Sequence, residues 1–192
     1  PFDSTWRQAT LVVNRNEGYW SLYVDGVEKF HIDSYKLLAP MDKLEIGGDN
    51  GPYAIDELAI WDRALTPEEV SSLRIAEQPF GPIIYREPQK FPVLKHFWNF
   101  NEGIGTTSAD LIGEADLIIN KDSWDNISLT NSAFISSWNK DVNINFPLLD
   151  SPDLSLTFWW RSVDVNGNRA RLALLDSSKN NVLSLNPSHF CS

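Results

Sequence analysis

Short runs with apolar residues at every second position recur along the 192-residue chain, and this two-residue period constrains its fold more than any other feature. Trp20, Leu22 and Val24 illustrate it: they share one face of a strand, because successive side chains of a strand point to opposite sides. Asp25-Gly26 follows, and this pair is a strong signal for a tight hairpin turn before the next run at residues 27–32. The sequence therefore predicts a meander of three antiparallel strands over residues 10–32.

Further runs of the same kind extend the prediction to most of the chain. One helix interrupts them: Thr66, followed by Pro67 and by Glu69 three positions after it, forms a capping box that predicts a short helix of about two turns. Many short strands separated by turns are typical of an antiparallel β-sandwich or jelly roll. The remaining predicted strands cover residues 44–46, 54–61, 96–100, 116–119, 133–135, 142–146, 154–160, 171–175 and 182–185.

The charge of the chain argues against two classes of partner. Its formal net charge is −10, whereas proteins that bind nucleic acid or an anionic membrane surface usually present a basic face. We also find no apolar run near the roughly 20 residues that a membrane-spanning helix needs. We therefore expect no nucleic-acid partner and no membrane insertion.

Two groups of motifs resemble parts of one known fold. The string IDELAIWDRALTPEEV at residues 55–70, preceded by WRQATLVV at 6–13, WSLYVDG at 20–26 and LEIGG at 44–48, resembles the second half of a laminin-G-like, concanavalin A-like jelly roll. The strings KHFWNFNEG at 95–103, SADLIG at 108–113 and LSLTFWWR at 154–161 are similar to its first half. The resemblance implies an all-β, laminin-G-like antiparallel sandwich with one short helix.

The order of the two halves is reversed with respect to that family. Residues 1–73 correspond to its C-terminal half and residues 96–192 to its N-terminal half, with a Pro-rich linker at 74–95 between them. Three arrangements remain open: a permuted single sandwich, a window from a longer array of domains, and pairing of halves between neighbouring chains. We expect a complete sandwich, and a permuted one first, because unpaired halves would expose long strand edges.

Catalysis is not expected. Glycosidases of related fold carry a Glu-x-Asp-x-x-Glu run on one strand, but here Asp56 and Glu57 are adjacent, and regular alternation would send them to opposite faces. The remaining reactive candidates lack the spacing of a metal site or a nucleophilic triad, and we assign them no role. These candidates are His31, His96, His189 and Cys191.

A binding site has more support. The segment GGDNGPY at residues 47–53 combines turn residues with Asp49, Asn50 and Tyr53, whose oxygens and ring suit the hydroxyls and apolar face of a sugar. Turn chemistry alone accounts for this composition, so a plain strand connector is the first alternative. We retain Asp49, Asn50 and Tyr53 as the candidate ligand-binding residues.

Calcium is the cofactor that the resemblance implies. Laminin-G-like relatives often hold a structural Ca²⁺, and the matching positions are Asp56 in the IDE string and Asp110 in the DLIG turn. An ion shared by these two carboxylates would join the halves of a fold that has a single cysteine and no internal disulfide. The alternatives are ordinary ones: Asp56 accepting backbone hydrogen bonds, and Asp110 forming an Asx turn.

These expectations combine into a non-catalytic, extracellular or surface-located module for recognition or adhesion, with carbohydrate or a surface protein as its partner. A structural subunit of a surface fibre, pilus, capsid or other assembly, built by pairing of sandwich halves or of neighbouring repeats, is the alternative. An accessory module of a glycan-degrading enzyme is a further one.

Overall fold

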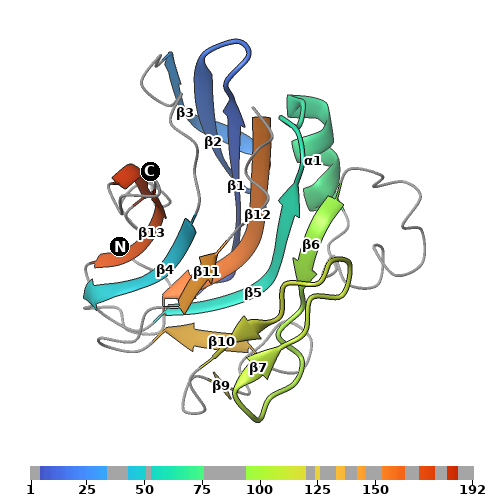
Figure 1. The fold of residues 1–192 in the computed structure, drawn as a ribbon. Helices are drawn as coiled ribbons and strands as arrows, with labels where there is room; N and C mark the ends of the chain where they lie inside the picture. Colours follow the sequence, from blue (N-terminus) through green and yellow to red (C-terminus); the bar gives the residue numbers. More distant parts are fainter. Residues whose placement is uncertain are drawn as a thin grey trace.

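Two antiparallel sheets dominate the computed structural model, which describes residues 5–33, 43–50, 53–75, 94–119, 124–125, 133–136, 142–145, 153–162, 169–175 and 181–185. Figure 1 shows helix α1 (Pro67–Ile75) on one side of the larger sheet and the smaller sheet on the other. This arrangement places two apolar interiors, one on each face of the larger sheet.

The larger sheet has eight strands, and the predicted meander forms one end of it. Its order is β3-β2-β1-β12-β5-β10-β9, and β6 pairs with β5 beyond the end of β10. The strands are β1 (Arg7–Asn14), β2 (Tyr19–Val24), β3 (Val27–Asp33), β5 (Tyr53–Trp61), β6 (Leu94–Trp98), β9 (Trp124–Asp125), β10 (Ala133–Ser136) and β12 (Asp153–Ser162).

The turn between β2 and β3 is the predicted one. Asp25 and Gly26 have φ angles of 53° and 74°, the left-handed conformation that a two-residue hairpin requires at both positions. The Asp25 carboxylate accepts hydrogen bonds from the Gln8 backbone N–H at 3.1 Å and from Arg7 Nη1 at 2.8 Å. The turn is therefore also attached to the start of β1.

The smaller sheet has four strands in the order β11-β4-β13-β14. Its members are β4 (Lys43–Asn50), β11 (Val142–Asn145), β13 (Arg169–Leu175) and β14 (Asn181–Leu185), and a separate two-stranded ribbon joins β7 (Thr107–Ser108) to β8 (Leu117–Ile118). Strand β4 is longer than predicted: it continues through Gly47 to Asn50, where Asn50 pairs with Arg169 of β13. The cross-strand partner extends the strand through residues that have little strand preference of their own.

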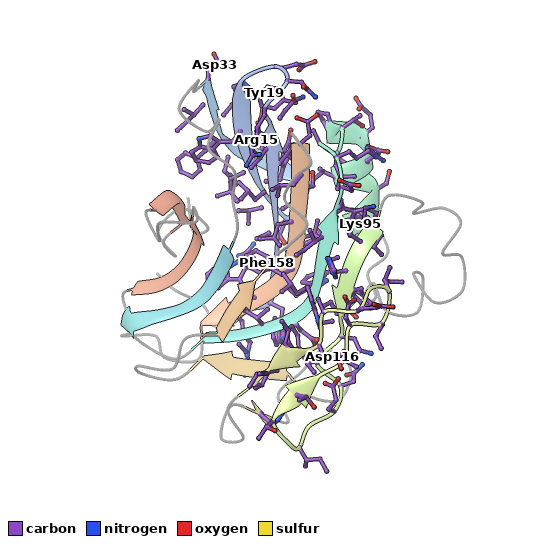
Figure 2. The ribbon with its side chains drawn as sticks, viewed as in Figure 1. Arg15, Tyr19, Asp33, Lys95, Asp116 and Phe158 are labelled. Atoms are coloured by element: carbon purple, nitrogen blue, oxygen red, sulfur yellow. The ribbon has the colours of Figure 1, made fainter. Side chains whose placement is uncertain are left out.

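The faces of the larger sheet follow the alternation seen in the sequence. On the face away from the helix, β1 contributes Ala9, Leu11 and Val13 to a core that includes Phe158, labelled in Figure 2. On the other face Val12 packs with residues of α1. The first core consists of Ala9, Leu11, Val13, Leu22, Val24, Ile55, Leu58, Ile60, Trp98, Phe100, Leu117, Ile119, Leu154, Leu156, Phe158 and Trp160. The second consists of Val12, Tyr23, Ala59, Trp61, Leu65, Val70, Leu73, Leu94 and Phe97.

Helix α1 begins as the capping box predicts. The Thr66 backbone N–H donates to Glu69 Oε2 at 2.9 Å, and the Glu69 backbone N–H donates to Thr66 Oγ1 at 3.3 Å. Val70 and Leu73 then face the second core. Among the described residues, no helix has the length and apolar character that crossing a membrane would require.

Strand β5 departs from the regular alternation that we expected at Asp56 and Glu57. Glu57 has a φ of 53°, and the register with β12 shifts there, between Thr157 and Trp159. Ile55 and Leu58 consequently face the same core although they are three positions apart. The irregularity coincides with a change of neighbour, since β10 pairs with β5 up to Ile55 and β6 pairs with it from Leu58. The prediction of simple alternation is wrong here.

Candidate functional site

Asp110, one of the two predicted metal ligands, lies beside strand β6 with its carboxylate surrounded by hydrogen-bond donors. Oδ1 accepts backbone N–H groups from Phe97 at 3.0 Å, Ile112 at 3.2 Å and Gly113 at 3.0 Å. Oδ2 accepts the Ala115 N–H at 3.2 Å and is bonded to His96 Nδ1. The bond to Ile112, two positions ahead, is the Asx turn that formed the alternative to a metal ligand.

These donors change the acidity of Asp110. Burial alone would raise the pKa of this carboxyl group, but the hydrogen bond from His96 and those from the backbone N–H groups of Gly113, Phe97 and Ile112 outweigh it and lower the pKa to about 2. The side chain of Asp110 is 0% exposed and that of His96 is 3% exposed. Asp110 is therefore a buried carboxylate at neutral pH.

Gly113 makes this close approach sterically feasible. A Cβ atom there would lie 2.6 Å from Asp110 Oδ2, 2.7 Å from His96 Nδ1 and 2.7 Å from the Lys95 carbonyl oxygen. The Lys95 oxygen belongs to the backbone of β6 and has no flexible side chain that could yield. The loop after Asp110 thus requires a residue without a side chain at position 113.

The loop also covers the outer edge of β6. Besides the Phe97 N–H bonded to Asp110, the Phe97 carbonyl accepts the Leu111 N–H at 2.8 Å. Asp116 extends the network, because its Oδ1 accepts the Asp110 N–H at 2.9 Å. The backbone N–H and carbonyl of Phe97 are thus both paired with the loop and are not available to another strand.

His96 is the residue that the sequence analysis missed. It stacks on Trp98, with ring centroids 5.4 Å apart and an interplanar angle of 9°, and its Nδ1 is bonded to Asp110. A carboxylate bonded to His Nδ1 is also the orienting half of many catalytic triads. The only advance signal is that His96, Trp98 and Phe100 alternate, and this pattern by itself predicts a core strand.

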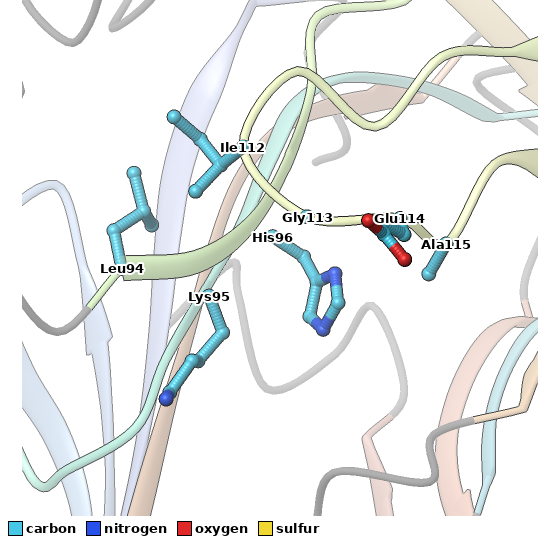
Figure 3. A pocket seen from close by; sticks show the side chains of 7 residues that line it. All are labelled: Leu94, Lys95, His96, Ile112, Gly113, Glu114 and Ala115. Carbon is cyan, nitrogen blue, oxygen red and sulfur yellow. The ribbon is translucent and has the colours of Figure 1, made fainter.

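A pocket of 520 Å³ opens beside His96, and Figure 3 shows it between β6 and the loop that follows Asp110. Lys95, on its rim, forms an ion pair with Asp62 at 3.0 Å. The lining contains no hydroxyl or thiol that His96 could activate as a nucleophile. Its residues are Leu94, Lys95, His96, Ile112, Gly113, Glu114 and Ala115.

Asp56, the second predicted metal ligand, is 0% exposed in the middle of β5, opposite Trp159 of β12. Its Oδ1 accepts the backbone N–H of Glu57 at 2.9 Å. Within the described part of the chain, no group of three or more His, Cys, Asp or Glu side chains is arranged to hold a metal ion. The N–H groups directed at both oxygens of Asp110 would oppose a cation, so Asp110 as arranged does not fit a Ca²⁺ site.

The three candidate ligand-binding residues lie where the chain passes from the smaller to the larger sheet. Asp49 and Asn50 end β4, and Tyr53 begins β5 opposite Ser136 of β10 and Ser162 of β12. The segment is thus mostly strand and not the seven-residue loop we expected. The positions of these three side chains, and the whole of His189, Cys191 and the connector at 76–93, lie outside the described residues.

Comparison with protein families bears on the fold of this site. Residues 1–71 match the Laminin_G_3 model of the concanavalin A-like lectin/glucanases superfamily. The match spans the β1–β5 strands and the start of α1, and includes the WRQATLVV and IDELAIWDRAL strings. No curated protein and no solved structure matches the chain significantly. Together with the antiparallel sheets and single short helix of the described residues, the match confirms the predicted fold class; the reversed order of halves stays a prediction.

Proposed function

We propose that this chain is a non-catalytic recognition module of laminin-G-like type that binds carbohydrate in an extracellular or surface setting. The observation that carries the proposal is the match of residues 1–71 to a superfamily whose description includes lectins, on a chain whose sheets suit that fold. Modules of this kind commonly serve in carbohydrate binding or adhesion.

The burial of Asp56, Glu57 and Asp110 supports a non-catalytic role. The superfamily description also includes glucanases, and glycoside hydrolysis needs two carboxyl groups that flank the scissile bond. Taken as whole residues, Asp56 is 0%, Glu57 1% and Asp110 9% exposed, and both oxygens of Asp110 already accept hydrogen bonds. These three carboxylates are not accessible to a glycan chain.

The corner between β4 and β5 is the proposed place of binding. Asp49 and Asn50 end strand β4 of the smaller sheet, and Tyr53 begins strand β5 of the larger sheet. A carboxylate, an amide and a phenol therefore belong to one short stretch that connects the two sheets. Sugar recognition commonly uses such a combination of polar side chains with an aromatic ring.

A glycan array probed with the purified chain tests the proposal. We expect the parent chain to bind a defined group of glycans. A variant with Asp49→Ala, Asn50→Ala and Tyr53→Ala should bind the same glycans at least about tenfold more weakly, which corresponds to a loss of roughly 1.4 kcal/mol in binding free energy. Glu17→Ala, in the exposed turn between β1 and β2, is the control and should bind like the parent. Unchanged binding by the triple variant would exclude this corner.

The array is run with calcium and again with EDTA. Because Asp110 is saturated by N–H donors, we expect binding to survive EDTA. Binding lost in EDTA would contradict this expectation, support a calcium-dependent module, and call for mutation of Asp56 and Asp110. A folded sample that binds no glycan in either buffer would overturn the carbohydrate proposal and favour the structural subunit.

A further inference from the structure

The sandwich is built from two segments of the chain that alternate in space. We call residues 5–75 the N-terminal segment and residues 94–185 the C-terminal segment. In the larger sheet β12 lies between β1 and β5, and β5 also pairs with β6 and β10. In the smaller sheet β4 lies between β11 and β13. Every described neighbour of β4 and β5 in a sheet therefore comes from the other segment.

Side-chain contacts join the same two segments. The Asp153 carboxylate of β12 accepts the backbone N–H groups of Arg15 at 2.8 Å and Asn16 at 3.2 Å, in the turn after β1. Ser155 Oγ accepts the Leu65 N–H at 2.9 Å and donates to the Arg63 carbonyl at 2.9 Å. The first core likewise mixes both segments, for example Leu11 and Ile55 with Leu156. The second core consists mainly of N-terminal residues and is completed by Leu94 and Phe97 of the C-terminal segment.

One stretch of chain, residues 76–93, links the segments. It contains Pro79, Pro82, Pro88 and Pro92, which favour extended backbone. Such a stretch spans up to about 56 Å at roughly 3.1 Å per residue. Yet Leu73 and Leu94, which flank it, belong to the same core cluster. The two flanks of the stretch are therefore fixed on one core, whereas its sequence favours an extended backbone.

We propose that two copies of this chain exchange their C-terminal segments, so that β12 of each copy fills the place between β1 and β5 of the other. Every strand pair and core contact described above is retained in such a dimer, because both copies have the same sequence. The exchanged and closed forms then differ in the path of residues 76–93 and in the entropy of association. Concentration therefore decides between them.

The pairing of Thr10 with Thr157 provides a test. These residues are opposite each other in β1 and β12 and are 1% and 0% exposed, so two folded monomers in surface contact cannot join them. In a Cys191→Ser background, a Thr10→Cys chain and a Thr157→Cys chain are mixed, unfolded, refolded together at rising concentration and oxidised. We expect a disulfide-linked dimer of one copy of each.

Two controls make the result decisive. A single chain carrying both Thr10→Cys and Thr157→Cys should form the bond internally, which shows that the geometry permits it, and Thr10→Cys refolded alone should give no linked dimer. If the double variant closes and the mixture gives no linked dimer at any concentration, the proposal is overturned.

Light scattering of the unmodified chain, refolded over the same concentrations, gives a second readout. We expect the ratio of dimer to monomer to rise about tenfold for each tenfold rise in monomer concentration, as mass action requires. A monomer at every concentration would also overturn the exchange. Glycan binding enters neither measurement, so the outcome is independent of the proposed function.

Discussion

At the scale of single residues, Asp110 shows how a local environment sets the role of a carboxylate. Its donors are backbone N–H groups of the loop and of β6, together with His96, and the missing side chain of Gly113 lets them approach. The sequence indicated Asp110 as a residue of interest and left two roles open. The contacts found are those of an internal acceptor that fixes a loop on a sheet edge.

The first prediction concerns the pH dependence of stability at Asp110. The folded-state pKa, at about 2, lies below the usual 3.8, so the ionised form stabilises the fold above pH 4 and this contribution is lost as the pH falls through about 2. The shift corresponds to about 2 kcal/mol. We expect the stability difference between the parent and Asp110→Asn to shrink by about that amount from pH 5 to pH 2, measured by urea unfolding.

Glu114→Gln is the matched control, because Glu114 is an exposed carboxylate in the same loop. Its stability difference from the parent should stay nearly constant over this pH range. A difference for Asp110→Asn that is also independent of pH would show that the carboxylate is not held ionised by its donors.

At the scale of elements, strand β5 and helix α1 show two kinds of local determination. The helix begins at a capping box that the sequence contains in full. The strand contains a bulge at Glu57, at the point where the strand paired with β5 changes from β10 to β6. The bulge therefore coincides with a change of neighbouring strand. A pattern confined to a few residues predicts the start of the helix but not the bulge in the strand.

The bulge gives a prediction that reverses the usual ranking of two residues. Both Glu57→Ala and Glu57→Gly remove the carboxylate, but only glycine adopts a φ of 53° without strain. We expect Glu57→Gly to be more stable than Glu57→Ala by about 1 kcal/mol in urea unfolding, although glycine normally weakens a strand. Greater stability of Glu57→Ala would mean that the bulge is absent.

The capping box is tested by Thr66→Ala. This change removes the acceptor of the Glu69 N–H at the start of α1, and we expect the free energy of unfolding to fall by about 1 kcal/mol. Ser72→Ala, at an exposed position inside the same helix, is the control and should change stability by less than about 0.5 kcal/mol. Equal effects of the two changes would contradict the cap.

At the scale of the whole molecule, the interleaving of the two segments makes the sandwich one cooperative unit. Strand β12 is bordered on both sides by N-terminal strands, and each core face is completed only when both segments are present. Opening one segment would expose the edges and apolar faces of the other.

This cooperativity predicts the effect of cutting the chain between the segments. A site-specific protease site is placed within residues 76–93 and cleaved in the folded protein. We expect the two fragments to elute together in size-exclusion chromatography and to unfold in one transition, because the contacts described between them are made by residues on either side of the cut stretch. An uncut chain carrying the same site is the control. Separation of the fragments under native conditions would contradict the interleaved architecture.

The sequence by itself determined the features that depend on residues a few positions apart. The Asp25-Gly26 turn, the capping box at Thr66 and the alternating faces of β1 and β2 are of this kind, because they arise from backbone preferences and from the two-residue period. The resemblance of residues 55–70 likewise pointed to the fold class.

Tertiary structure decided the rest. The place of β12 between β1 and β5, the bulge at Glu57, the continuation of β4 to Asn50 and the bond between His96 and Asp110 each depend on a neighbour that is distant in the chain. Such neighbours are selected by burial and backbone pairing over the whole molecule, and a pattern of nearby residues does not specify them.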